Sequence, residues 1–110
     1  MSGGNKGNAG FVFNAWAACV TANLPTQRGM GCLIAKTQQG IYTVTLSAQL
    51  EMAAQNYALV LHCSQTAGNA NVFYSVADTS NTVKTVAFVD AAAAAQDPVS
   101  FTVGLVYLLT

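Results

Sequence analysis

One histidine and three cysteines are the side chains of this 110-residue sequence best suited to nucleophilic or metal chemistry. They are His62, Cys19, Cys32 and Cys63. The cysteines lie 13 and 31 residues apart, and these spacings match no zinc-binding pattern. His62 and Cys63 are adjacent, and neighbours on a strand point to opposite faces of the sheet, so we do not expect them to share one ion. The sequence therefore predicts neither a metal nor another cofactor.

Catalytic motifs are missing from the sequence as well. It contains no G-x-S-x-G, no H-E-x-x-H and no P-loop. A dyad of His62 with Cys19 or Cys32 remains an alternative. Four carboxylates offer a formal hydrolytic pair, but no motif selects two of them; they are Glu51, Asp78, Asp90 and Asp97. We expect a protein that is not an enzyme.

The cysteines are better explained as small apolar side chains. Three thiols cannot all pair within one chain. We expect them to be buried and reduced, which fits synthesis and assembly in a reducing cytoplasm.

Aromatic side chains are the remaining candidates for a binding site, because they stack on sugar rings. The four tyrosines are better explained by packing in a core or an interface, where large aromatic side chains dominate. Trp16 lies two residues after Asn14, on the same side of a strand. That pairing occurs in sugar sites and also in half-exposed strands, so both interpretations of Trp16 stay open.

The composition describes an apolar chain with little charge. Hydrophobic residues make up 53% and charged residues 7%, against about 25% charged residues in an ordinary domain. Four Lys or Arg and four Asp or Glu cancel, so no basic patch indicates nucleic acid. No apolar run has the length of a membrane span. Because a neutral surface tends to associate, we expect a subunit covered by neighbours, with a neutral monomer as the alternative.

Seven strand-like runs follow one another at about ten-residue spacing. They span residues 10–20, 29–36, 40–47, 56–64, 71–78, 82–90 and 98–108. Turn-forming residues separate the runs, and β-branched and aromatic residues concentrate inside them. This pattern predicts an all-β fold: one antiparallel β-sandwich or jelly-roll-like domain over residues 10–110, with seven or eight strands.

Two stretches contain helix-forming residues and compete with this pattern. They span residues 47–55 and 90–98, and both are too short to be stable helices alone. We interpret both as connections. The alanine run at 91–95 is expected to pack closely against another part of the protein.

Several strands are apolar on both faces, and a thin sandwich covers only one of them. Residues 57–61 show no alternation of polar and apolar side chains, and a strand with two apolar faces needs two covers. One cover is the facing sheet, and we expect the other to be a second chain in an oligomer. The residues predicted for this interface are Trp16, Tyr57, Leu59, Val60, Leu61, Phe88 and Leu105.

Residues 1–9 are rich in glycine and asparagine, and they predict a flexible N-terminal arm. Simple fraying and contact with a neighbouring protein both stay open. Arg28 and Glu51 are expected in loops, either as solvated charges or in ion pairs between subunits. The arm residues predicted to make such a contact with a neighbouring protein are Gly3, Gly4, Asn5 and Lys6.

Three apolar segments occur in a familiar order. They are G-I-Y-T-V-T-L at 40–46, N-Y-A-L-V-L at 56–61 and D-P-V-S-F-T-V at 97–103. As a set they resemble the small β-sandwich, jelly-roll-like domains of tailed-phage fibres, head fibres and capsid decoration (cement) proteins. The loop between Leu46 and Asn56 is longer than the turn usual in that family, and Met52 stands where proline is frequent. The resemblance implies a virion structural protein that forms a homotrimer.

Within that family we expect a capsid decoration subunit on the virion surface, with the major capsid protein as its partner and the stability of the phage head as its function. The chain starts at Met1 and offers neither a shaft nor a tail-attachment domain, which favours decoration over a long tail fibre. Two alternatives stay open: a receptor- or glycan-binding fibre or knob domain, and the coat subunit of a small virus. No nucleic acid or membrane partner is expected.

Overall fold

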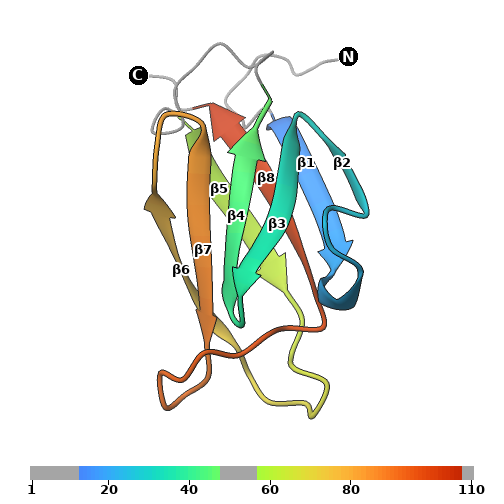
Figure 1. The fold of residues 1–110 in the computed structure, drawn as a ribbon, viewed down its shortest axis with the longest axis vertical. Helices are drawn as coiled ribbons and strands as arrows, with labels where there is room; N and C mark the ends of the chain where they lie inside the picture. The colour runs from blue at the N-terminus through green and yellow to red at the C-terminus, as the bar shows by residue number, and fades with distance from the viewer. Residues whose placement is uncertain (1–12, 48–56, 108–110) are drawn as a thin grey trace, which may run out of the picture.

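Eight strands and one short 3-10 turn make up the described part of the chain, residues 13–47 and 57–107 of a computed structural model (Figure 1). They are β1 (Phe13–Val20), η1 (Thr21–Asn23), β2 (Arg28–Met30), β3 (Cys32–Gln38), β4 (Ile41–Leu46), β5 (Tyr57–Cys63), β6 (Phe73–Asp78), β7 (Val83–Val89) and β8 (Ser100–Tyr107). The predicted all-β fold is confirmed. None of the described residues form a helix long and apolar enough to cross a membrane.

The strands form two antiparallel sheets that face each other. The first sheet has the order β2-β1-β8-β5, and the second sheet has the order β3-β4-β7-β6. Figure 1 shows β3, β4, β7 and β6 lying across the strands of the first sheet as a separate layer. The chain passes from one layer to the other between β2 and β3, between β4 and β5, between β5 and β6, and between β7 and β8. The predicted β-sandwich is therefore the architecture of the protein.

The strand predicted at 29–36 is two strands. Gly31 has a positive φ of 81°, a conformation that glycine adopts readily and other residues avoid. Before Gly31, β2 pairs with β1 in the first sheet; after it, β3 pairs with β4 in the second sheet. The chain changes layer at this glycine, which gives eight strands where the sequence shows seven runs.

Alternating side chains build the core between the sheets. On β4, Tyr42, Val44 and Leu46 are buried, and the threonines between them lie on the opposite face. The rings of Tyr42, Phe88 and Phe101 have centroids 5.0–5.5 Å apart, in edge-to-face or tilted arrangements, which aromatic pairs prefer. Because Phe101 belongs to the first sheet and the other two belong to the second, this cluster joins the two layers.

Asp97 fastens the connection between β7 and β8 to the hairpin of β3 and β4. Its carboxylate accepts hydrogen bonds from the Tyr42 hydroxyl at 2.6 Å and from the Gly40 backbone N–H at 2.8 Å. The Lys36 ammonium lies 2.8 Å from its second oxygen. Gly40 has a φ of 77°, and a Cβ there would lie 2.7 Å from the Phe88 carbonyl oxygen, so the close approach requires glycine.

The connection after β7 has no helix, as expected, but its alanines are not packed. The Asp90 carboxylate accepts hydrogen bonds from the backbone N–H groups of Ala92 and Ala94 at 2.8 and 3.0 Å, and these bonds hold a local turn. Residues 91–95 are exposed on that turn, so the expected close packing is wrong. The arm at 1–9 and residues 48–55 of the other predicted connection lie outside the described residues.

Candidate functional site

The outward face of the first sheet carries two rows of side chains that cross its four strands. Strand register places the members of each row side by side. The first row is apolar and consists of Met30, Trp16, Gly104 and Val60. The second row is mainly polar and consists of Arg28, Ala18, Thr102 and His62. An apolar strip therefore runs beside a strip of hydrogen-bonding groups.

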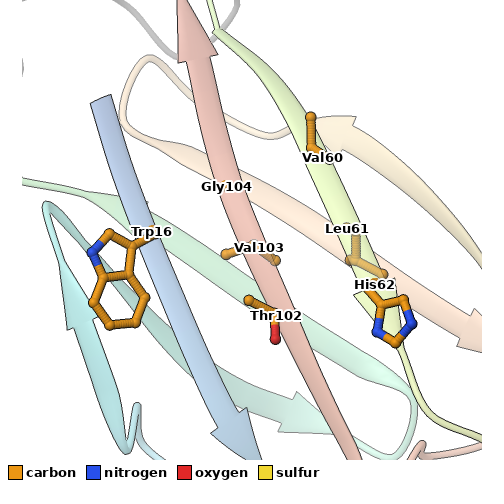
Figure 2. Close-up of a pocket in the computed structure, with 7 residues that line it drawn as sticks. All are labelled: Trp16, Val60, Leu61, His62, Thr102, Val103 and Gly104. Atoms are coloured by element: carbon orange, nitrogen blue, oxygen red, sulfur yellow. The ribbon is translucent and has the colours of Figure 1, made fainter. Parts of the chain in front are cut away.

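Gly104 makes a groove in the first row, because it places no side chain between Trp16 and Val60. Neighbouring strands lie ~4.8 Å apart, so Trp16 and Val60 are separated by roughly 10 Å. A cavity of about 360 Å³ occupies this place. Its lining consists of Trp16, Val60, Leu61, His62, Thr102, Val103 and Gly104. We call it the Trp16 groove; Figure 2 shows Trp16 on β1 and His62 on β5 on opposite sides of β8, with Thr102 and Gly104 between them.

The side chains around the Trp16 groove are accessible. Trp16 is half-buried, and Val60 and Met30 are 51% and 67% exposed. The guanidinium carbon of Arg28 lies 5.9 Å from the centroid of the Trp16 ring, within the range of a cation–π contact. An exposed apolar surface bordered by polar groups is typical of a binding site.

Arg28 lies in a strand and not in the predicted loop. Residues 28–30 pair with β1, which places Arg28 opposite Ala18. This pairing sets its side chain on the same face as Trp16. Glu51, the other charge predicted in a loop, lies outside the described residues.

The residues predicted for an oligomer interface divide between two faces. Trp16 and Val60 belong to the outward face and border the groove. Phe88 and Leu105 point between the sheets and are fully buried within the single chain, and Leu59 and Leu61 pack against that core. The predicted interface role of Phe88 and Leu105 is therefore wrong, because the facing sheet already covers both side chains. The side chain of Tyr57 lies outside the part of the chain that the structure describes.

The histidine and the cysteines do not come together. His62 is exposed on the outward face, whereas Cys63 packs against the core, as strand alternation predicts. Cys19 is buried between the layers, and Cys32 belongs to the second sheet. His62 faces away from both, so the dyad that the sequence left open is not formed. Among the described residues, no three His, Cys, Asp or Glu side chains gather at metal-binding distance.

The three thiols are free. Desolvation by burial raises the pKa of Cys19 and that of Cys32 to about 11. Such thiols stay protonated at neutral pH, and the protonated form is a poor nucleophile and a poor metal ligand. They act as small apolar side chains of the core.

Each described carboxylate already has structural partners. Asp78 lies 2.6 Å from the ammonium of the buried Lys84, and Asp90 and Asp97 hold the turn and the hairpin contact described above. A second cavity, of about 280 Å³, is bordered by Asp97, Thr21 and Pro98. Because the Asp97 oxygens are engaged with the chain itself, we assign this region a role in the fold.

Sequence reasoning finds Trp16, places Arg28 in a loop instead of a strand, and misses Gly104. One signal was available for Gly104: in F-T-V-G-L, Thr102 and Gly104 are the small or polar residues between apolar ones. The sequence does not show that β8 pairs with β1 and β5, because these strands are distant in sequence and their register is a property of the whole sheet.

Comparison with models of known protein families finds no match, and no curated protein matches the sequence. Among solved structures, the chain is similar to part of the phiAB6 tailspike, crystallised in complex with three-repeated oligosaccharides of the Acinetobacter baumannii surface polysaccharide. The TM-score is 0.61 at 18% identity, and the match covers 84% of this chain and 20% of the tailspike chain. The chain thus spans about a fifth of that protein's length, and the likeness is one of fold.

Proposed function

We propose that the protein is a structural domain of a phage particle that binds a glycan through the Trp16 groove. The observation that carries this proposal is a half-buried indole and an exposed valine on either side of a glycine, beside a cavity on a sheet face. A sugar ring has an apolar C–H face and a polar edge. The apolar row suits the first of these surfaces, and the polar row beside it suits the second.

Each row has a defined part in such binding. Trp16 and Val60 offer apolar walls on either side of Gly104, and an aromatic wall gives a large contact area with little loss of conformational entropy. Thr102 offers a hydroxyl that donates or accepts a hydrogen bond, and the His62 ring offers both a donor and an acceptor. A few polar groups of this kind, placed around an apolar pocket, orient a bound ligand.

The fold likeness to a tailspike supports attachment to a surface glycan over capsid decoration. That tailspike was crystallised with surface oligosaccharides, and the Trp16 groove gives this chain a place for such a ligand. Decoration gains no comparable support, because the residues predicted to contact the major capsid protein lie outside the described residues. That the protein is part of the virion is likewise part of this proposed function.

The proposed role is binding without catalysis. The described carboxylates are tied to backbone or lysine partners, and His62 stands on the outward face away from them. Catalysis of glycoside cleavage uses a pair of carboxyl groups flanking the scissile bond. The groove presents no such pair from the described residues.

A homotrimer is the proposed assembly. The number three comes from the resemblance to phage fibre and decoration proteins. Self-association is supported by the low charge of the chain and by the exposure of every residue of β6 at the edge of the second sheet. An unpaired, apolar sheet edge is a surface on which another chain can pair.

A glycan array tests the proposed function. The wild-type protein and Trp16→Ala are compared on bacterial surface polysaccharides, with Val99→Ala as the control because Val99 is exposed outside the groove. We expect the wild type and the control to bind at least one polysaccharide. Loss of a central tryptophan should weaken that binding by roughly tenfold to a hundredfold. Binding to no glycan, or binding that does not depend on Trp16 in a variant with unchanged circular dichroism, would contradict the proposal.

A further inference from the structure

Arg28 has no acidic partner within residues 13–47 and 57–107. The other described cations are paired, with Lys36 at 2.8 Å from Asp97 and Lys84 at 2.6 Å from Asp78. The Arg28 side chain is exposed and contacts the face of Trp16. A guanidinium has five N–H donors and no acceptor, so these donors are left for water or for a ligand.

The two rows of the outward face contain no acidic residue. Asp78 lies on β6 of the second sheet, and Asp90 and Asp97 lie in the connection after β7. An anion on this face would therefore meet a cation at β2 and no carboxylate among its eight row members. The charge of the described face is complementary to an acidic ligand.

We propose that the ligand of the Trp16 groove is an acidic saccharide whose carboxylate binds Arg28. This inference rests on the proposed function and names its ligand class. Guanidinium and carboxylate match in two parallel hydrogen bonds, which adds geometric selectivity to the charge attraction. A neutral sugar uses the groove but leaves these donors unmatched.

The spacing of the strands sets the size of this ligand. Arg28 approaches the indole from the β2 side of β1, whereas Gly104 lies on the β8 side. Two strand spacings, roughly 10 Å, separate β2 from β8. An oligosaccharide of two or more rings spans that distance, with one ring at Gly104 and a carboxylate at Arg28.

Carboxyl reduction gives a direct test, because it removes the charge and keeps the sugar sequence. Bacterial surface polysaccharides are immobilised in native form and after carbodiimide–borohydride reduction of their carboxyl groups to alcohols. Binding of the full chain is measured for the wild type, Arg28→Gln, Arg28→Lys and Trp16→Ala. We expect a native polysaccharide to bind and its reduced form to bind roughly tenfold to a hundredfold more weakly. Arg28→Gln should abolish this difference, and Arg28→Lys should restore part of it.

The outcomes separate this inference from the proposed function. Equal binding of the native and reduced forms, with Trp16→Ala binding neither, overturns the acidic ligand and keeps the groove as a glycan site. Binding to neither form overturns both proposals. A third outcome is a wild-type protein that binds no saccharide but is oligomeric by sedimentation velocity, together with a monomeric Arg28→Gln variant. That result would overturn both proposals and show that a second copy of the chain occupies this face.

Discussion

Asp97 shows how one residue far along the chain fixes local structure. Its carboxylate is held by Tyr42, Gly40 and Lys36 from the β3–β4 hairpin. Desolvation raises the pKa of this carboxyl, but the three donors outweigh it and lower the pKa below its ordinary value of 3.8. Burial, together with the Asp97 carboxylate, raises the pKa of Tyr42. The ionised acid and the protonated phenol are therefore the pair that the fold stabilises.

We expect this pair to make stability depend on pH in the acidic range. A group with a lowered folded pKa stabilises the protein above its unfolded pKa, and that contribution is lost as pH falls through the folded pKa. Asp97→Asn should lower the free energy of unfolding at pH 7 by about 1–3 kcal/mol. Urea denaturation at pH 7, 5 and 3 is the measurement, and the gap between variant and wild type should narrow at pH 3. An equal gap at all three values would show that the carboxylate charge is not the cause.

At the same scale, prediction from sequence works for residues whose role is local. Trp16 is a recognisable candidate because it is the one tryptophan of the sequence and lies within a strand-like run. Asp97 directly precedes Pro98, and its sequence neighbourhood is that of an ordinary loop residue. Its partner Tyr42 is 55 positions away, so only the folded arrangement reveals the contact.

β6 is the element whose surface is least explained by the single chain. It forms one edge of the second sheet, and all six of its residues are exposed, including Phe73, Tyr74 and Val76. Proteins usually protect such edges with charge, proline or a covering segment. Apolar residues that stand open on both faces of an edge strand favour pairing with another chain.

A lysine on this edge should weaken self-association. Val76→Lys places a charge at a position that is 38% exposed, so the fold should tolerate it while an apolar contact between chains should not. Sedimentation velocity should show a lower average mass than for the wild type at equal concentration. Val99→Lys, at a position 44% exposed in a connection, is the control and should not change the mass. A monomeric wild type, or an unchanged mass in Val76→Lys, would remove β6 from the interface.

The elements themselves were largely predictable, because alternation is a local pattern. β4 buries Tyr42, Val44 and Leu46 as its sequence indicates. Gly31 was the exception at this scale: a glycine inside an apolar run is compatible with a continuous strand, and its positive φ follows from the change of layer. The order of strands within each sheet was not predictable, because β1 meets β8 only after the chain has closed.

At the scale of the whole molecule, the sandwich explains how one face of each two-faced apolar strand is covered. The facing sheet covers Phe88 and Leu105 completely. On the outward face Val106 is also buried, so the single chain supplies one cover and part of the other. In the apolar row of the outward face, Met30 and Val60 stay exposed and Trp16 is half-buried beside the buried Gly104. Under the proposed function, this remaining surface binds a glycan and the edge of β6 mediates self-association.

Nuclear magnetic resonance of the ¹⁵N-labelled protein, titrated with the polysaccharide fragment selected on the array, tests the central claim most directly. We predict that the amide signals of Trp16, Thr102, Gly104 and His62 shift together with one saturation curve. Gly104→Val, which places a side chain between Trp16 and Val60, should keep the strand signals and lose these shifts. Shifts confined to β6 or to the connection after β7, or shifts that persist in Gly104→Val, would contradict a glycan site in the Trp16 groove.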